Sequence, residues 1–179
     1  MKNSIEKVLL NEQEIQTKVQ ELGAKISRDY AGKELLVVVI LKGSVIFAAD
    51  LLRAITIPVE IDFISVSSYG KGAVSTGVVT IKKDLNEPIE GKHILIIEDI
   101  LESGNTLFRL TKILQERNPA SMEICTLLNK PDRREAEVCP KYSGYDIPDE
   151  FVVGYGLDYA EKFRNLSYIG ILKREVYEK

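Results

Sequence analysis

The sequence has few of the residues that mark several large functional classes. Its only histidine, His93, excludes a zinc site of the His-Glu-x-x-His type, and we expect it to be a structural or surface residue. Its two cysteines, Cys125 and Cys139, are too few for a disulfide framework, so we expect reduced thiols in a cytoplasmic protein. Neither a Walker A motif nor a Gly-x-Gly-x-x-Gly motif is present, which argues against a P-loop ATPase and a dinucleotide enzyme.

Long apolar runs and an excess of positive charge are also missing. The longest apolar stretch, residues 35–41, is far too short to cross a bilayer, so we expect no membrane attachment. The formal net charge is -3, which gives no overall attraction to a polyanion, and we expect no nucleic-acid partner. Any phosphate binding must therefore come from a local arrangement of residues.

Strand-like and helical patterns alternate along the chain. Apolar residues at helical spacing predict a helix over residues 11–30, and continuous β-branched residues predict a buried parallel strand over 35–41. The later patterns predict a helix over 44–54, which Ser44 can cap, a strand over 59–66, a strand over 93–97, a helix over 106–117 and a strand over 122–128. We therefore predict an α/β fold with a mostly parallel central sheet flanked by helices, whose ligands bind beyond the carboxyl ends of the strands.

Two regions fall outside this alternation. The glycine-rich stretch 67–80 predicts a mobile loop or lid. The tail from residue 130 is interrupted by prolines and glycine and holds two short strand-like runs, 151–153 and 168–172. We assign the N-terminal segment and about 130–179 to a small hood subdomain within one domain that spans residues 1–179.

The most informative segment, residues 94–107, is a buried strand that leads into two adjacent acids and then a helix. Four small or turn-forming residues at the helix start predict a phosphate cradle: Ser103, Gly104, Asn105 and Thr106. Glu98 and Asp99 carry oxygen atoms that can accept hydrogen bonds from the ribose hydroxyls and help to hold a hydrated Mg²⁺. The alternative is that these acids only cap a loop.

This segment resembles the motif that binds phosphoribosyl pyrophosphate (PRPP) in type I phosphoribosyltransferases, specifically the hypoxanthine-guanine enzymes. The resemblance implies that residues 103–106 bind the 5′-phosphate and that Glu98 and Asp99 bind the ribose hydroxyls. The family usually has Asp where this chain has Glu102, as the candidate base near the purine N7. Glu102 is therefore our candidate catalytic residue and part of the PRPP site, although it adds one methylene, and the alternative is that it only stabilises the loop.

A second anion site is expected at the turn after the strand over residues 35–41. This turn leads into a helix, and the resemblance implies that Lys42 and Gly43 contact pyrophosphate, with a cis peptide bond before Lys42. An ordinary helix start is the alternative. Ser68 and Tyr69 match the family's Ser-Tyr pair at the base of a loop that closes over the reaction and excludes water.

The purine side is expected in the tail. Lys130 matches a lysine that donates to O6 of the base, which favours a 6-oxopurine over adenine, although a solvated lysine is the alternative. The resemblance implies that Phe151 stacks on the purine and that the Val152 backbone pairs with its edge. Asp158, next to the base, is implied as a ligand of a second Mg²⁺, and Arg164 as a pyrophosphate contact. Phe151 as a core aromatic and Arg164 as a surface charge are the alternatives.

The resemblance covers nearly the whole chain and implies a Mg²⁺-dependent enzyme of purine salvage. It would convert hypoxanthine, and guanine, with PRPP into the nucleoside monophosphate and pyrophosphate, with Glu98, Asp99 and Asp158 as metal ligands. A homodimer or homotetramer is implied. The alternatives are a xanthine-preferring enzyme, a pyrimidine-sensing regulator that binds RNA, which the acidic charge balance disfavours, and a non-catalytic nucleotide-binding module.

Overall fold

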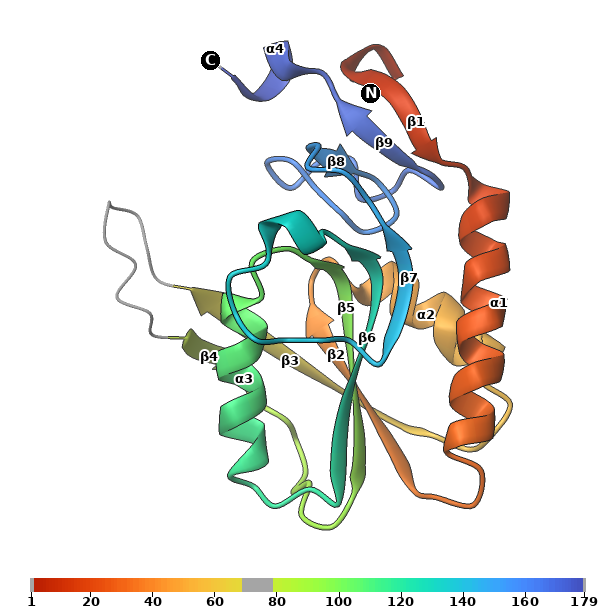
Figure 1. Cartoon of the computed structure of the whole chain (residues 1–179), viewed down its shortest axis with the longest axis vertical. Coiled ribbons are helices and arrows are strands. Elements are labelled where there is room, and N and C mark those ends of the chain that lie inside the picture. The colour runs from red at the N-terminus through yellow and green to blue at the C-terminus, as the bar shows by residue number, and fades with distance from the viewer. Residues whose placement is uncertain (1, 69–78, 179) are drawn as a thin grey trace.

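The computed structural model describes residues 2–68 and 79–178, in which two β-sheets lie one above the other (Figure 1). The larger sheet has the order β4 (Val79–Lys83), β3 (Glu60–Ser68), β2 (Leu35–Leu41), β5 (His93–Leu101), β6 (Ser121–Asn129) and β7 (Tyr142–Asp146). The smaller sheet has the order β1 (Ile5–Leu10), β9 (Ile169–Leu172) and β8 (Val152–Val153). Both ends of the chain lie beside the smaller sheet.

The larger sheet is mostly parallel, as the sequence predicts. Strand β2 pairs in parallel with both β3 and β5, β5 pairs with β6, and β6 pairs with β7. Only β4 is antiparallel to its neighbour, β3. The carboxyl ends of the parallel strands therefore meet at one edge, and this edge faces the smaller sheet in Figure 1.

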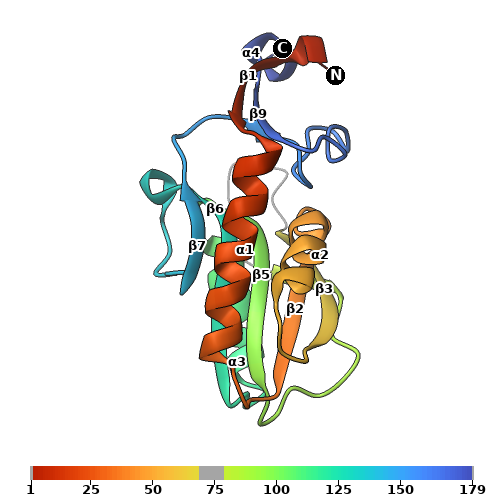
Figure 2. The same cartoon turned by 90° about the vertical axis from the view of Figure 1, so that its right-hand side faces the viewer.

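Helices cover both faces of the larger sheet (Figure 2). They are α1 (Glu12–Asp29) and α2 (Val45–Ala54) on one face and α3 (Asn105–Gln115) on the other. Val37 and Val39 of β2 belong to the core under α1 and α2, whereas Leu36 and Val38 belong to the core under α3. Because successive side chains of a strand point to opposite faces, a strand covered on both sides is apolar at every position.

Helix α1 confirms the prediction over residues 11–30. Asn11 accepts a hydrogen bond from the N–H of Glu14, and the Glu14 carboxylate accepts one from the N–H of Asn11, so a capping box closes the first turn. Ile15, Val19 and Ile26 are fully buried on its inner face. No helix within residues 2–68 and 79–178 is long and apolar enough to cross a membrane.

Strand β5 is longer than the 93–97 that its apolar run predicts. It continues to Leu101, because β6 supplies pairing partners beyond Ile97: Glu98 pairs with Thr126 and Leu101 with Asn129. The partner on the other side, β2, pairs with β5 only as far as Ile97. Glu98 and Asp99 therefore lie inside the end of a strand, at the point where β2 departs from it.

The smaller sheet joins the two ends of the chain. Strand β1 pairs with β9, and β9 pairs with β8, both antiparallel. A four-residue helix, α4 (Arg174–Tyr177), follows β9, and short 3-10 helices lie at Lys2–Ser4 and Pro131–Arg133. Strand β7 lies within the range 130–179 that we assign to the hood, yet it pairs with β6 in the larger sheet.

Candidate active site

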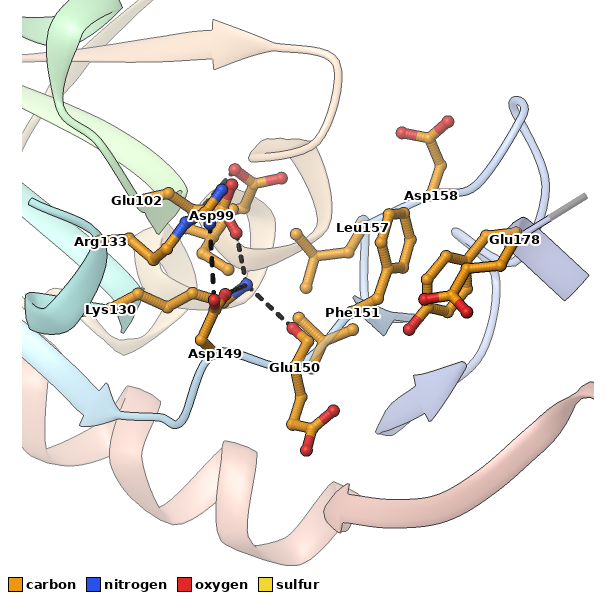
Figure 3. Close-up of a pocket in the computed structure, with 13 residues that line it drawn as sticks. Asp99, Glu102, Lys130, Arg133, Asp149, Glu150, Phe151, Leu157, Asp158 and Glu178 are labelled. Atoms are coloured by element: carbon orange, nitrogen blue, oxygen red, sulfur yellow. Dashed lines mark hydrogen bonds and ion pairs between the residues drawn. The ribbon is translucent and has the colours of Figure 1, made fainter. Parts of the chain in front are cut away.

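A cleft of about 670 Å³ opens where the ends of β5 and β6 face the smaller sheet (Figure 3). Six of the residues that line it are site residues predicted from the sequence: Asp99, Glu102, Lys130, Phe151, Val152 and Asp158. The sequence analysis did not single out the other seven: Ile100, Arg133, Asp149, Glu150, Leu157, Tyr177 and Glu178. The cleft therefore brings together side chains from the carboxyl end of β5, from the segment after β6 and from the C-terminal third of the chain.

Glu98 and Asp99, the acid pair, are held in place by Ser44, which precedes α2. The Ser44 hydroxyl donates to Glu98 Oε1 at 3.1 Å and accepts from the N–H of Asp99 at 3.0 Å. Its side chain makes no capping hydrogen bond, so the predicted helix cap is instead a link between two strand ends. The N–H of Ile100 donates to Asp99 Oδ1 at 2.8 Å and orients that carboxylate.

Burial raises the pKa of Glu98 well above its ordinary value, and the neighbouring Asp99 charge raises it further. Burial also raises the pKa of Asp99, although hydrogen bonds from Glu98 and from the Ile100 N–H act in the opposite direction. Two half-buried carboxyl groups in contact favour a shared proton or a nearby cation. Within the described residues no ready group of three His, Cys, Asp or Glu side chains exists to hold a metal. This pair therefore fits an ion that takes only one or two carboxylates and completes its shell with water and substrate oxygens.

The turn that follows β2 packs directly against the acid pair. The peptide bond between Leu41 and Lys42 is cis, as the resemblance implies. A Cβ on Gly43 would overlap the Asp99 carboxylate, so only glycine allows this close approach. Residues 42–44 and the strand end of β5 thus form one continuous rim of the site.

The predicted phosphate cradle forms the start of α3. Gly104 precedes the helix with φ of +79°, a left-handed conformation that favours glycine. Helix α3 begins at Asn105, so the first-turn N–H groups of residues 105–107 lack carbonyl partners within the helix and can bind an anion. The Ser103 carbonyl accepts from the N–H groups of Glu135 and Ala136, both at 3.0 Å, which fixes the loop from outside.

Arg134 holds the backbone that leads into the predicted phosphate cradle. Its Nε donates to the Glu102 carbonyl at 2.9 Å and its Nη2 to the Leu101 carbonyl at 3.3 Å. The other Nη atom donates to the Val138 carbonyl, and Nη2 also reaches Asn129 Oδ1. Arg134 therefore joins the ends of β5 and β6 to the segment after them.

Lys130 and Glu102 form an ion pair on the floor of the cleft. The ammonium of Lys130 also donates to the Glu150 carbonyl at 2.9 Å, and the residue is only 4% exposed. The solvated lysine that we considered as an alternative is thus wrong. The Glu102 carboxylate is directed to Lys130 (Figure 3), so a hydrogen-bond donor and an acceptor stand side by side.

Four charged side chains meet on the opposite rim. Arg164 Nη2 lies 2.8 Å from Asp158 Oδ1 and 3.4 Å from Glu161 Oε2, and Glu161 Oε2 lies 3.1 Å from the Lys42 ammonium. The Nη1 atom of Arg164 donates to the Gly156 carbonyl at 2.7 Å, and its Nε is buried without a partner among the described residues. The structure thus brings Lys42 and Arg164 together, and Arg164 is not the isolated surface charge of the alternative interpretation.

Phe151 presents an aromatic surface to the cleft. The residue is 38% exposed, so it is not a core aromatic, and its carbonyl accepts from the N–H of Leu172 of β9 at 2.8 Å. Val152 is buried and pairs with Ile171 in the smaller sheet. The smaller sheet therefore positions both residues at the edge of the cleft.

Two of the predicted site residues can be placed only in part. Ser68 is the last residue of β3, paired with Val79 of β4, and Tyr69 lies outside the described residues. Most of the loop predicted over 67–80 also lies outside them. Its ends at Ser67 and Thr80 are paired strand residues.

Sequence reasoning missed several residues that the geometry selects. Ser44 was interpreted only as a helix cap, and Arg134 belongs to the polar run Asp132–Arg133–Arg134–Glu135, which has no pattern to separate an anchoring arginine from a solvated one. Glu161 and Tyr177 lie close to predicted residues in space and carry no motif of their own. Only tertiary contacts identify them.

Comparisons with known proteins agree with this arrangement. Residues 7–160 match the phosphoribosyl transferase domain family. The chain is 56% identical over 177 residues to the hypoxanthine-guanine phosphoribosyltransferase of Staphylococcus aureus, with 99% of each chain covered. A crystal structure of a hypoxanthine phosphoribosyltransferase from the same species superposes with a TM-score of 0.97 at 56% identity, covering 100% of this chain and 97% of that one.

A more distant structure supports the same assignment. A hypoxanthine-guanine phosphoribosyltransferase from Bacillus anthracis, with a HEPES molecule in its active site, gives a TM-score of 0.91 at 47% identity, covering 94% of this chain and 99% of that one. The fold, the strand-end acids and the helix-start loop occur together in this chain. The chain therefore belongs to the phosphoribosyltransferase family, and within it to the hypoxanthine-guanine enzymes.

Proposed function

We propose that this enzyme transfers the 5-phosphoribosyl group of PRPP to a 6-oxopurine, hypoxanthine or guanine, in cytoplasmic purine salvage. The observation that carries the proposal is the placement of the Lys130–Glu102 pair beside the exposed Phe151 ring in one cleft, with the acid pair at its edge. In the reaction the bond from ribose C1′ to pyrophosphate breaks, and a bond from C1′ to the purine nitrogen N9 forms. The purine loses one proton.

The Lys130–Glu102 pair complements one edge of a 6-oxopurine. O6 accepts a hydrogen bond, and N7 on the same edge carries the proton in the tautomer whose N9 is free to attack, so a neighbouring donor and acceptor can engage both at once. Lys130 donates to O6, and Glu102 takes the proton that leaves the base. Adenine carries an amino donor in place of O6, and its contact with the ammonium of Lys130 is repulsive.

The phosphoribosyl group fits between the acid pair and the start of α3. The N–H groups and hydroxyls of residues 103–106 hold the 5′-phosphate. Glu98 and Asp99 accept hydrogen bonds from the ribose hydroxyls. Lys42 and Arg164 neutralise pyrophosphate, and Gly43 contacts it through its backbone. Ser68 and Tyr69 belong to the segment that excludes water from the reacting sugar.

Magnesium fits the donor set of this chain. Glu98 and Asp99 on one side and Asp158 on the other offer carboxylate oxygens, and the raised pKa values of the first two carboxyl groups favour a cation beside them. When bound with PRPP, Mg²⁺ supplies charge neutralisation for the leaving pyrophosphate. These residues orient the sugar so that the C1′ atom faces the purine on Phe151.

We further propose that residues 1–179 form one domain with a hood, in which β1, β8 and β9 cover the base. A homodimer or homotetramer that binds neither nucleic acid nor membrane is part of the same proposal. Both cysteines are free thiols, which suits a reducing cytoplasm.

A spectrophotometric assay with PRPP, Mg²⁺ and each of hypoxanthine, guanine, xanthine and adenine tests the function. Turnover with hypoxanthine or guanine is expected. Activity with adenine alone would overturn the role of Lys130, and a preference for xanthine would replace the proposed substrate. RNA binding in a gel shift without turnover would support a regulator instead.

Separate replacements of Asp99 and Glu102 test the assignment of roles. Asp99→Asn is expected to weaken PRPP binding and turnover together, because it removes an oxygen shared by metal and ribose. Glu102→Gln is expected to lower kcat with little change in PRPP affinity, because it removes only the proton acceptor. Undiminished turnover in both variants contradicts these roles.

A further inference from the structure

The ring of Phe151 has an aromatic neighbour, Tyr177, which also lines the cleft. Tyr177 stacks on it with ring centroids 4.8 Å apart and planes inclined by 22°, and Tyr159 meets its edge at 5.7 Å and 86°. In Figure 3, Leu157, Lys130 and Glu102 lie on one side of Phe151, and Glu178, the neighbour of Tyr177, lies on the other. One face of the ring is therefore backed by Tyr177 while the other remains toward the floor of the cleft.

Helix α4 holds Tyr177 in this position through the smaller sheet. The N–H of Lys173 donates to the Ser4 carbonyl at 3.0 Å, and the N–H of Glu178 donates to the Arg174 carbonyl at 2.8 Å, which closes the short helix. Val176 and Tyr177 pack against a small core formed by Val153, Phe163 and Leu172. The chain end is thus anchored to the strand whose Leu172 N–H binds the Phe151 carbonyl.

We propose that Tyr177 is a positioning residue for the purine: it fixes the plane of the Phe151 ring, so that the bound base extends a stack of two rings to three. This inference rests on the proposed function, because it assumes that the base stacks on Phe151. Phe151 is 38% exposed, and without a supporting neighbour its ring would rotate between orientations that base binding would have to restrict. The Tyr177 ring supplies that restriction in advance, so the base binds a surface already in place.

The effect of Tyr177 should fall on the base and not on PRPP. Tyr177 lines the same cleft, but within the described residues no hydrogen bond, ion pair or ring contact joins it to a predicted PRPP residue. Loss of an aromatic pair of this kind is expected to raise the KM of the purine about 3- to 10-fold. The KM of PRPP should change by less than about twofold, since its charged contacts remain.

Tyr177→Leu tests the proposal in the full-length enzyme, with steady-state kinetics for hypoxanthine and PRPP and with Tm as a measure of folding. Leucine keeps an apolar side chain but has no flat ring. The matched control is Val176→Ala, which removes packing from the same helix but leaves the Tyr177 ring in place. Tyr177→Phe restores the ring and is expected to restore the KM of the purine.

The outcomes separate this inference from the proposed function. A raised KM for hypoxanthine in Tyr177→Leu alone, with rescue in Tyr177→Phe, supports the positioning role. Equal effects of Tyr177→Leu and Val176→Ala on that KM, in an active enzyme, overturn it and leave the function intact. Absence of turnover with any 6-oxopurine in the unaltered enzyme overturns the function itself.

A binding measurement gives a second readout. Calorimetry with IMP, which carries the base, should show a Kd raised about 3- to 10-fold by Tyr177→Leu, and PRPP should bind almost unchanged. If Tyr177→Leu fails to fold, Tyr177→Met allows the same comparison, because its flexible chain fills the space without a ring. Equal losses for both ligands would contradict the proposal.

Discussion

The carboxylate of Glu161 lies 3.1 Å from the ammonium of Lys42, across 119 positions of sequence. The same carboxylate lies 3.4 Å from the guanidinium of Arg164. Hydrogen bonding to Lys42, and then the charge of Lys42, lower the pKa of Glu161, so it is ionised at neutral pH. In the free chain, Glu161 thus occupies the cations that we assign to pyrophosphate.

Glu161→Gln is expected to lower the KM of PRPP about 2- to 5-fold, because the substrate no longer displaces a carboxylate from Lys42 and Arg164. The gain is small, since Lys42 and Glu161 are both largely exposed. Glu87→Gln, in an exposed loop before β5, makes the same change in net charge and should leave this KM unchanged. A higher KM in Glu161→Gln would show that Glu161 assists binding instead.

Sequence patterns predicted the central part of the fold because its elements carry their own signals. Residues 35–41 are apolar at every position, as a strand covered on both faces must be, and the structure has a strand with these bounds. Strand β7 carries no such signal. Its Ser143, Gly144 and Asp146 favour a turn, and only pairing with the exposed edge of β6 makes this segment a strand.

The candidate site follows from the sequence only where its residues lie close together along the chain. Glu98, Asp99 and residues 103–106 fall within one segment, 98–106, so a local pattern contains this whole group of expected ligands. Arg134 and Tyr177 act through neighbours that are distant in sequence, and their roles depend on geometry that no local pattern encodes.

Lys130→Gln is expected to reduce the preference for 6-oxopurines. Glutamine can both donate and accept, so it no longer discriminates O6 from an amino group. Loss of a charged donor in a buried position should lower kcat/KM for hypoxanthine about 10- to 100-fold. The ratio of kcat/KM for hypoxanthine over adenine, measured in parallel assays, should fall at least about tenfold. An unchanged ratio would remove Lys130 from base recognition.

Arg134→Lys is expected to destabilise the enzyme and weaken PRPP binding. Lysine keeps the charge but cannot reach the carbonyls of Leu101, Glu102 and Val138 together. Loss of about 2–3 kcal/mol would lower Tm by about 5–10 °C, and the loosened phosphate loop should raise the KM of PRPP.

Arg133→Lys is the matched control for stability. Arg133 is adjacent in sequence, and its guanidinium lies 3.5 Å from the Asp149 carboxylate in an exposed ion pair. Such pairs contribute little, so Tm should change by less than about 2 °C. Similar melting of both variants would show that the carbonyl contacts of Arg134 are not what holds the loop.

Buried tyrosines should make the fold sensitive to alkaline pH. Burial raises the pKa of Tyr30 to about 12 and raises the pKa values of Tyr142 and Tyr155 further. Above about pH 10 the unfolded chain releases phenolic protons that the folded chain retains, so the free energy of unfolding falls as pH rises. For Tyr30 the loss should approach about 1.4 kcal/mol per pH unit between pH 10 and 12. Urea unfolding at increasing pH, followed by tyrosinate absorbance in this tryptophan-free chain, measures this loss of stability.

Tyr30→Phe keeps the ring but not the ionisable group, and its urea midpoint should fall less steeply with pH. Equal slopes for the two proteins would mean that Tyr30 ionises as readily in the folded chain as in the unfolded one.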